Sequence, residues 1–305
     1  MIDITHKSST LRRAIAQAIV KVGSLETIQA LVDRKVPKGD VFEMAKTAGL
    51  FAAKRTADMI PDCHPLPIEY TGISYQIEGN SIYIFAEIHT IYKTGVEVEA
   101  MHTASVVALT MYDMLKPIDK NISIEQIKLI EKKGGKTDYS LKGTEGLGAS
   151  VIVCSDSIAA GKNEDKAGKA IIEKLEKYGL KVVDYKIIPD EKEIIQQSLS
   201  NLAGMGRDVV IFTGGTGLSP RDVTPEAIRP LLDKEIPGVE EAIRVYGQQR
   251  TPYAMLSRSV VGLIGKTLVL ALPGSTKGAS ESIDAVFPAI LHIFRVMEGT
   301  RHEGA

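Results

Sequence analysis

A segment between Lys132 and Gly148 divides this chain of 305 residues into two halves. The segment is rich in Gly and Lys and has neither the apolar spacing of a helix nor the alternation of a strand. Directly after it, residues 149–154 are almost entirely apolar, as expected for a buried first strand of a new sheet. Because the length suffices for two ordinary domains, we predict one over residues 1–144 and another over residues 145–305.

Composition and charge indicate in which cellular compartment the protein works and which kinds of partner it does not bind. The formal net charge is −1 and neither half is strongly basic, so nucleic acid is not an expected partner. The chain has two cysteines, Cys63 and Cys154, and no Cys/His spacing typical of zinc sites, which fits a reducing cytoplasm. It begins without the pattern of a secretory leader, and no apolar stretch approaches the roughly 20 residues of a membrane-spanning helix. We therefore expect a cytoplasmic protein that does not bind membranes.

The first half mixes helices and strands irregularly. Apolar spacing predicts helices over residues 8–21, 40–58 and 97–115. Strands are predicted over 68–77, 81–91 and 122–129, the first two joined by a hairpin turn at 78–80. Hairpin pairing together with helices is typical of the α+β class.

The second half alternates strands and helices regularly. Strands are predicted at 149–154, 181–188, 208–213 and 267–272, and helices at 164–178, 191–203, from Thr224 onward, and at 278–298. This alternation predicts an α/β fold with a mostly parallel sheet, in which ligands bind at the carboxyl ends of the strands. Polar motifs follow the strands directly, as expected for such a site: Ser155-Asp156, Pro189-Asp190, Thr213–Gly217 and Pro273–Lys277.

The run Gly214-Gly215-Thr216-Gly217 has the composition of an anion-binding loop, because glycines let backbone N–H groups approach a ligand closely. Thr224-Pro225 predicts a helix that starts with Thr as N-cap, and a helix N-terminus favours negative charge. Asp222 precedes that start. A carboxylate beside bound phosphate needs a cation between them, and Mg²⁺ held by Asp222 and Asp190 would supply it. These residues predict metal-assisted nucleotidyl or phosphoryl transfer.

Simpler interpretations of the same residues remain open. The glycine run is also a sufficient tight turn between strand and helix, and Asp190 is also suited to a loop or cap. The run is neither a Walker A loop, since no Gly-Lys-Ser/Thr ends it, nor a dinucleotide fingerprint. The prediction depends on four motifs meeting at one edge of the sheet.

Candidate polar residues in the first half are more scattered. Asp113 and Lys116 are three apart on one predicted helix and so share a face, where a Lys of lowered pKa could move protons. His64 lies in a stiff loop between prolines, and Lys54 and Arg12 could bind a phosphate chain. Equally, Asp113–Lys116 could be a surface ion pair, His64 a structural hydrogen-bond partner and Lys54 part of a solvated face.

Six motifs of the second half resemble, in order and spacing, the molybdopterin-binding MoaB/MogA family, over about residues 148–298. They are Ser155-Asp156-Ser157, Ile188-Pro189-Asp190-Glu191, Thr213–Gly217, Arg221-Asp222-Val223-Thr224-Pro225, Leu256-Ser257-Arg258 and Leu272-Pro273-Gly274. The resemblance implies a three-layer αβα fold and transfer of adenylate from Mg·ATP to molybdopterin. Asp190 and Asp222 match the catalytic carboxylates that hold the metal. Substrate-binding positions would be Ser155, Asp156, Thr213, Gly214, Gly215, Thr216, Gly217, Ser257, Pro273 and Gly274.

Motifs spread over about residues 2–138 look like the MoaC family of cyclic pyranopterin monophosphate synthases. They include Lys38-Gly39-Asp40-Val41, Pro61-Asp62-Cys63-His64-Pro65, Met111-Tyr112-Asp113-Met114 and Lys133-Gly134-Gly135-Lys136. The resemblance implies a ferredoxin-like α+β fold, a hexamer with sites at subunit interfaces, and rearrangement of cyclised dihydro-GTP with loss of pyrophosphate. Lys38, Asp113 and Lys116 match the proton-transfer set. Substrate-binding positions would be Arg12, Lys54, Cys63, His64, Glu97, Glu99 and Lys136. Val98 and Leu115 depart mildly from the family pattern.

Together the two resemblances predict a bifunctional protein of molybdenum cofactor biosynthesis. Its ligands would be cyclised dihydro-GTP, cyclic pyranopterin monophosphate, molybdopterin and ATP with Mg²⁺. The alternatives are a second domain that only binds molybdopterin or organises the oligomer, a first domain kept for assembly alone, and another nucleotide transferase or hydrolase of similar fold.

Overall fold

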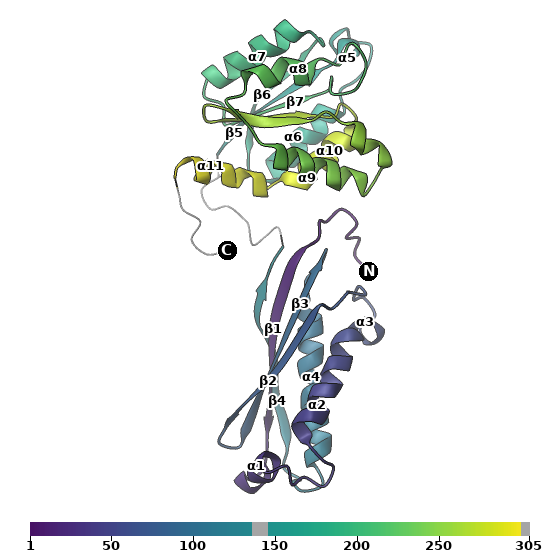
Figure 1. Ribbon diagram of the computed structural model, residues 1–305, viewed down its shortest axis with the longest axis vertical. Helices are drawn as coiled ribbons and strands as arrows, with labels where there is room; N and C mark the ends of the chain where they lie inside the picture. Colours follow the sequence, from purple (N-terminus) through teal and green to yellow (C-terminus); the bar gives the residue numbers. More distant parts are fainter. Residues whose placement is uncertain (136–145, 300–305) are drawn as a thin grey trace. The chain divides into compact units, whose positions relative to one another are not determined.

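A computed structural model of the chain describes residues 1–135 and 146–299 (Figure 1). The chain divides into two compact units, Met1–Asp138 and Tyr139–Ala305, which are treated separately below. The boundary that we predict between residues 144 and 145 lies outside the described residues.

The N-terminal unit is a four-stranded antiparallel sheet with helices against it. Its elements are β1 (Thr10–Lys21), α1 (Leu25–Val32), α2 (Val41–Lys54), α3 (Thr56–Met59), β2 (Tyr70–Glu78), β3 (Ser81–Tyr92), α4 (Glu97–Leu115) and β4 (Ser123–Lys133). The strand order is β2-β3-β1-β4, and each neighbouring pair is antiparallel. The α+β class is therefore confirmed by the topology. The hairpin between β2 and β3 pairs Glu78 with Ser81, as the predicted turn requires.

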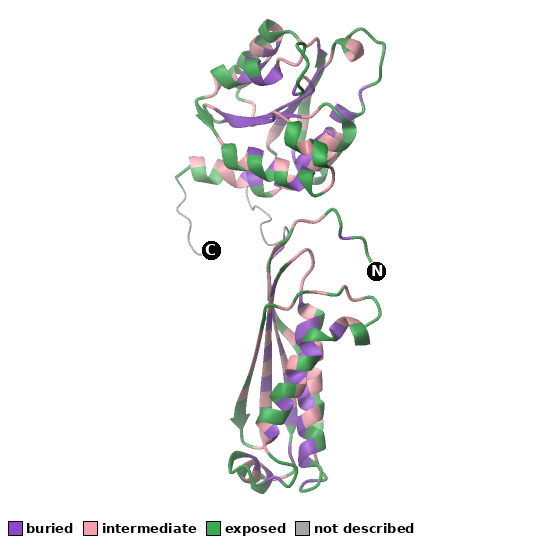
Figure 2. Ribbon diagram, turned by 45° about the vertical axis from the view of Figure 1, so that its right-hand side comes forward, coloured by how far each residue is buried: buried purple, intermediate pink, exposed green. Residues whose placement is uncertain are grey.

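Alternation along the two central strands places the core of this unit on one face of the sheet. In β1 the fully buried side chains are Ala14, Ala16, Ala18 and Val20, and in β3 they are Ile82, Ile84, Ala86 and Ile88. The helices α2 and α4 cover this face (Figures 1 and 2). The small alanines of β1 allow α4 to lie close to the sheet.

Residues 10–21 form strand β1, so the helix predicted over residues 8–21 is wrong. Leu11, Ile15 and Ala18 fit a helical spacing, but the alternation of buried Ala16, Ala18 and Val20 fits a strand equally well. In a short apolar run the two periods cannot be separated, and pairing with both β3 and β4 decides in favour of the strand.

The C-terminal unit is an α/β domain with a six-stranded sheet. Its strands are β5 (Gly148–Cys154), β6 (Lys181–Ile188), β7 (Val209–Thr213), β8 (Lys234–Glu235), β9 (Val260–Ile264) and β10 (Thr267–Leu272). The order is β6-β5-β7-β10-β9-β8. Strands β6, β5, β7 and β10 are parallel, β9 is antiparallel to β10, and β8 is antiparallel to β9. The predicted, mostly parallel sheet is therefore confirmed.

Helices cover both faces of this sheet, which gives three layers (Figure 1). They are α5 (Asp156–Ala159), α6 (Ala167–Lys177), α7 (Lys192–Gly204), α8 (Thr224–Ile228), α9 (Pro237–Gln248), α10 (Thr276–Val286) and α11 (His292–Met297). One core packs α6, α9 and α10 against the sheet through residues such as Ile171, Ile243 and Ile283. The other packs α7 and α8 through Ile195, Leu199 and Ile228. Successive residues of β7 alternate between the two cores, as both faces are buried.

Two expectations for the C-terminal unit need correction. The single closing helix predicted over 278–298 is interrupted: α10 ends at Val286, and Pro288 separates it from a short 3₁₀ turn and α11. Proline has no N–H group and cannot continue the helical ladder. The sequence interpretation also missed α9 and β9. In neither unit does any helix of the described residues combine the length and apolarity needed to cross a bilayer.

The α2–α4 contact depends on the absence of a side chain at Gly49. A Cβ atom there would lie 2.5 Å from Cγ2 of the buried Val107 and 2.6 Å from Cδ1 of Ile73. We expect Gly49→Ala to lower the free energy of unfolding by about 1–2 kcal/mol, because overpacking outweighs the helix propensity gained. Urea unfolding would measure the change.

Gly204, at the end of α7, is the matched control, since nothing lies within 4 Å of the Cβ it would gain. Gly204→Ala should leave stability unchanged or raise it by up to about 1 kcal/mol. Equal effects of the two substitutions would contradict the close packing of α2 on α4.

Candidate active sites

Four parallel strands of the C-terminal unit end at one edge of the sheet, and the predicted polar motifs gather there. Gly214 and Gly215 follow β7 with φ values of +105° and +61°, a region that side chains disfavour. A Cβ on Gly214 would lie 2.1 Å from the carbonyl oxygen of Cys154, at the end of β5. The Gly214 N–H also donates to Leu272 O, at the end of β10. The glycines are thus required because three strand ends meet at this loop.

A cavity of about 470 Å³ opens beside this loop. Seven residues predicted from the sequence line it: Gly215, Thr216, Gly217, Asp222, Ser257, Pro273 and Gly274. Thr213 lies behind it, buried, with its hydroxyl donating to Pro273 O at 2.8 Å. The structure therefore brings together residues from four separate motifs around one cavity large enough for a small ligand.

The rest of the cavity wall is built by α9, the 3₁₀ turn Pro252–Leu256 and the start of α10. The sequence interpretation missed Ile243, Arg244 and Tyr253 of this wall, which belong to no predicted motif. Leu256, Ser275 and Lys277 lie within predicted motifs but were not named as site residues. Ser275 caps α10 by accepting from the Gly278 N–H, so a helix N-terminus lies at the cavity. A Ser directly after Pro-Gly at a strand end was the signal that could have identified this cap.

Asp190 is half-buried at the end of β6, and its charged form is disfavoured. Burial raises the pKa of this carboxyl, and the nearby carboxylates of Asp156 and Asp222 raise it further. Its Oδ1 is buried without a hydrogen-bond partner among the described residues, as is Oγ1 of Thr224. A Cβ on Gly215 would lie 2.8 Å from Asp190 Oδ1 and 2.3 Å from Thr224 Oγ1. Gly215 therefore keeps open a small polar space beside Asp190.

Thr224 does not act as the predicted N-cap. The helix α8 begins at Thr224 itself, the flanking Val223 has no side-chain cap bond, and the Thr224 hydroxyl points into the buried space beside Asp190. Packing of α8 on α7 sets this start, so the hydroxyl is directed inward rather than toward the helix N–H groups.

These residues fit a magnesium ion bound together with phosphate. No group of three or more His, Cys, Asp or Glu side chains in the described residues is arranged to hold a metal by itself. Mg²⁺, however, is usually held by one or two carboxylates, water and substrate phosphates. Asp190 and Asp222, one with an unpartnered buried oxygen, provide two carboxylates next to a loop suited to phosphate.

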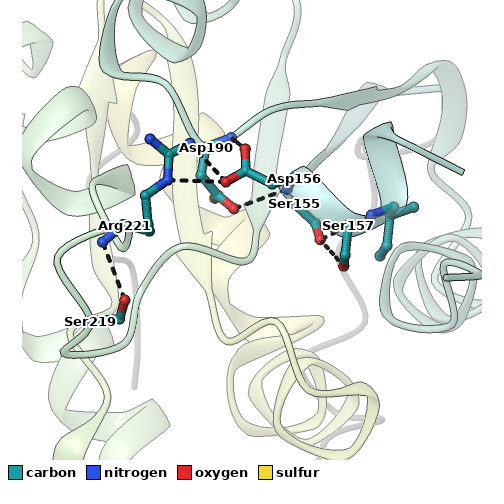
Figure 3. A network of polar contacts seen from close by, with 7 residues as sticks. Ser155, Asp156, Ser157, Asp190, Ser219 and Arg221 are labelled. Atoms are coloured by element: carbon teal, nitrogen blue, oxygen red, sulfur yellow. Dashed lines mark hydrogen bonds and ion pairs between the residues drawn. The ribbon is translucent and has the colours of Figure 1, made fainter. Parts of the chain in front are cut away.

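Asp156 and Arg221 link the loops that carry these two carboxylates (Figure 3). Asp156 Oδ1 accepts from the Asp190 N–H at 3.0 Å, and the Asp156 N–H donates to Asp190 Oδ2 at 3.3 Å. Arg221 donates from Nε and Nη2 to Asp156 Oδ2 at 3.0 and 2.7 Å. Ser155 caps α5 and exchanges a hydrogen bond with Ser157. The Asp156 pKa is lowered, mainly by Arg221.

In the N-terminal unit, Lys38, Asp113 and Lys116 come together at the C-terminal end of α4. Lys38 Nζ lies 2.7 Å from Asp113 Oδ2, and Lys116 Nζ lies 2.7 Å from Oδ1. Both lysines lower the pKa of Asp113 to about 2, Lys116 more strongly, and Asp113 in turn raises the pKa of Lys116. We name these three residues the lysine cluster.

A second group lies at the N-terminal end of α4 and lines a cavity of about 400 Å³: Cys63, His64, Glu97 and Glu99. Cys63 Sγ donates to Glu99 Oε1 at 3.5 Å, and His64 Nε2 lies 2.9 Å from Ile2 O. Glu99 is 2% exposed, and burial raises its pKa. Burial and the Glu99 charge raise the pKa of Cys63 to about 11. We name these four residues the glutamate cluster.

Arg12 belongs to a small basic cavity next to the glutamate cluster, with which it shares Glu97. A Cβ on Gly134 would lie 1.9 Å from Leu11 O, and one on Gly135 would lie 2.2 Å from Arg12 Nη1, so this Gly-Gly pair is needed for close approach. Lys54 is exposed at the end of α2. Lys136, also predicted to bind substrate, lies outside the described residues.

The two clusters stand at opposite ends of one helix. From Glu99 to Asp113 is 14 residues of α4, which corresponds to roughly 21 Å at the rise of an α-helix. No side chain spans that distance. Within one chain, the residues predicted for a single N-terminal site therefore form two separate groups.

An α/β unit with a glycine loop and two carboxylates at its strand ends has the features of proteins that bind phosphorylated small molecules. Comparison of the sequence with known protein families identifies the family more narrowly. Residues 1–135 match the model of the MoaC family, and residues 150–292 match the model described as "Probable molybdopterin binding domain".

Relatives match both units or one of them. The chain is 40% identical over 302 residues to a molybdenum cofactor biosynthesis bifunctional protein of Chlorobaculum tepidum, which covers 99% of this chain and 96% of that one. It is 45% identical over 138 residues to a cyclic pyranopterin monophosphate synthase of Listeria welshimeri, covering 45% and 86%. A solved structure, the molybdopterin biosynthesis enzyme MoaB of Thermus thermophilus, shares 42% identity, covering 52% and 99%, with a TM-score of 0.48.

The chain thus belongs to the bifunctional molybdenum cofactor biosynthesis proteins, in which a MoaC domain precedes a MoaB/MogA-type molybdopterin-binding domain. Both resemblances recognised in the sequence are confirmed, in the same order along the chain.

Because Glu99 is buried, we predict that the free energy of unfolding depends on pH through this residue. Because its folded pKa is raised, the folded chain binds more protons than the unfolded chain just above the ordinary Glu pKa, and stability falls as the pH rises through that window. Glu99→Gln removes this loss. We expect the unfolding free energy of the variant, relative to wild type, to be higher at pH 7 than at pH 4 in urea titrations.

Glu78→Gln, at the exposed end of β2, is the matched control. Its difference from wild type should vary much less with pH. A Glu99→Gln difference that is the same at both pH values would contradict a buried, protonation-sensitive carboxyl.

Proposed function

We propose that the C-terminal unit transfers adenylate from ATP to the terminal phosphate of molybdopterin. The observation that carries this proposal is the half-buried Asp190, with an unpartnered Oδ1, placed near Asp222 beside the glycine loop and its cavity. When bound, Mg²⁺ would neutralise phosphate charge and stabilise the pentavalent arrangement at phosphorus. Asp190 and Asp222 would hold it.

The remaining groups of this unit bind and orient. Backbone N–H groups of the loop from Gly214 to Gly217 and the N-terminus of α10 favour a phosphate at the cavity mouth. Arg258 holds the loop in place, donating from Nε to Gly217 O at 2.8 Å and from Nη2 to Asp222 O at 2.7 Å. The loop geometry is thereby fixed before any ligand binds, which lowers the cost of ordering on binding.

The test is formation of adenylylated molybdopterin from molybdopterin, ATP and Mg²⁺. Asp222→Asn, which retains shape but not charge, should lower the rate roughly 100-fold or more, because metal-centred charge stabilisation is worth several kcal/mol. Glu241→Gln, exposed on α9, should leave the rate unchanged. A folded wild type that binds molybdopterin without product would make this unit a non-catalytic binding or oligomerisation module.

We propose that the N-terminal unit converts cyclised dihydro-GTP to cyclic pyranopterin monophosphate with release of pyrophosphate, at sites formed by two copies of the chain. The separation of the lysine cluster from the glutamate cluster, roughly 21 Å along α4, supports this. If a second α4 packs antiparallel about a twofold axis near the helix centre, each lysine cluster meets the partner's glutamate cluster, and two equivalent sites result.

The pKa shifts in the lysine cluster also support a site formed by two copies of the chain. A lysine that moves protons needs a lowered pKa, which burial or a neighbouring cation provides. In the single chain Lys116 is 51% exposed and its pKa is raised by Asp113. A second subunit that covers Lys116 and Asp113 would remove water from them, and the loss of water would lower the pKa of Lys116 toward the value that proton transfer needs.

The outward side of α4 suits such a covering subunit. Leu109 is 60% exposed, Tyr112 39% and Val98 36%, in positions that lie along one side of the helix. Exposed apolar side chains along a helix are typical of protein interfaces.

The ferredoxin-like class is proposed for this unit on its element order and its strand order. We also propose a hexamer in the cytoplasm, as both family resemblances imply threefold assembly, with a mass that light scattering can measure.

Mixing two inactive variants tests the composite site. Lys38→Ala disables the lysine cluster and His64→Ala the glutamate cluster, so each alone should lose most synthase activity. Co-expressed at equal levels, they should recover about a quarter of the wild-type activity, because that fraction of sites receives both intact halves in a symmetric assembly.

A pair of variants within one cluster provides the control. Lys38→Ala mixed with Asp113→Asn should recover nothing, since every site then carries a damaged lysine cluster. If the first mixture also recovers nothing beyond the residual activities, the site does not use two copies. If light scattering shows a stable monomer with full activity, both the hexamer and the shared site are wrong.

A further inference from the structure

The order of the strands puts Asp156 between the loops that carry the two proposed metal ligands. Strand β5 lies between β6 and β7 in the sheet. Asp156 follows β5, Asp190 follows β6, and Asp222 follows β7. A side chain at the end of the central strand is therefore in a position to reach both neighbouring loops.

Each oxygen of the Asp156 carboxylate contacts one of the two neighbouring loops (Figure 3). Oδ1 accepts from the Asp190 backbone N–H at 3.0 Å, and the Asp156 N–H returns a bond to Asp190 Oδ2 at 3.3 Å. Oδ2 receives Nε and Nη2 of Arg221 at 3.0 and 2.7 Å. Arg221 directly precedes Asp222, so the chain Asp190–Asp156–Arg221 joins the two loops.

We propose that Asp156 and Arg221 are positioning residues that set the orientation of Asp190 and its separation from Asp222. This rests on the proposed function only in taking those two carboxylates as the metal ligands. The Asp156 side chain holds the Asp190 backbone N–H, and the Asp156 backbone N–H holds Asp190 Oδ2. The unpartnered Oδ1 of Asp190 then faces the space beside Gly215. The pair is named the Asp156 clamp.

Charge explains why the clamp needs the arginine. Asp156, Asp190 and Asp222 would repel one another if nothing neutralised them, and each would repel a phosphate. Arg221 compensates one of the three charges and leaves a net charge that a divalent cation can balance. The proposed role of Asp156 is exerted through Asp190, and substrate binding by Asp156 stays a prediction.

The solvent exposure of Asp156 and Arg221 makes it possible to distinguish a positioning role from a contribution to the stability of the fold. The Arg221 side chain is 61% exposed and that of Asp156 46%. An ion pair so open to solvent contributes little to global stability. Breaking the clamp should therefore change the metal site while leaving unfolding nearly unaffected, a combination that a purely structural role would not give.

The experiment uses the full chain with Mn²⁺ alone as the probe, its affinity measured by electron paramagnetic resonance. The variants are Asp156→Asn, Arg221→Gln and the double substitution. Asn retains an oxygen for the Asp190 N–H and loses the charge that holds Arg221. Arg207→Gln is the matched control, because it breaks an Arg–Asp contact of 2.7 Å with Asp184 at the opposite ends of the strands.

We expect each single variant to weaken Mn²⁺ binding about tenfold, the usual effect of residues that orient metal ligands. The double variant should lose no more than either single one, because both remove the same pair. Arg207→Gln should bind like wild type, and the urea midpoints of the clamp variants should not move. Unchanged affinity in both single variants, or losses that multiply in the double variant, would overturn the proposal.

Hydrogen exchange keeps the clamp testable if the wild type binds no Mn²⁺, an outcome that would count against the proposed metal chemistry. The backbone amides of residues 190, 219, 221 and 222 should then still exchange faster in Arg221→Gln than in wild type or Arg207→Gln. Faster exchange would support the clamp as a device that joins the loops. Unchanged exchange would refute it independently of the metal.

Discussion

Like charges held close together are the physical constraint on which the C-terminal site depends. Asp156, Asp190 and Asp222 converge where parallel strands end, and Arg221 is the cation that contacts one of them directly. Burial raises the pKa of Asp190, and the neighbouring carboxylates raise it further. In the proposed function, this site binds a cation together with phosphate. The glycine loop, the cap of α10 and the anchoring by Arg258 all serve the same end, since they bring backbone N–H groups to the place where phosphate charge would otherwise be repelled.

A rigid helix imposes the corresponding constraint in the N-terminal unit. Because α4 holds Glu99 and Asp113 a fixed, long distance apart, their chemistry cannot be combined within a chain. In the proposed function, assembly is therefore part of the active site rather than an addition to it. The two proposed reactions are not consecutive, since sulfur must be added between them, so fusion of the units is explained as well by co-assembly as by transfer of an intermediate.

Particular residues show where sequence reasoning succeeded and where it failed. The motif from Thr213 to Gly217 was identified correctly as a close-approach loop at a strand end, because glycine patterns are local and nearly unambiguous. Residues 8–21 were assigned to a helix because alanines and isoleucines there satisfy two periods at once, and pairing with distant strands decided between them. The far wall of the cavity was missed because its members, such as Arg244 and Tyr253, are brought in by packing of α9, which carries no chemical motif of its own.

Local patterns in the sequence were enough to establish the two-domain organisation, both family memberships, the parallel sheet of the second unit and the identity of the residues gathered at its strand ends. Periodicity, glycine placement and motif order carry that information. Which of those residues act together became clear from the folded chain alone. The fold places Asp156 against Arg221 and Asp190 because β5 lies between β6 and β7, and it separates the lysine cluster from the glutamate cluster because a long helix lies between them. The helix itself was predicted over residues 97–115. Strand order, and the contacts that bring Lys38 to Asp113 and Cys63 to Glu99, act over distances that no local pattern records.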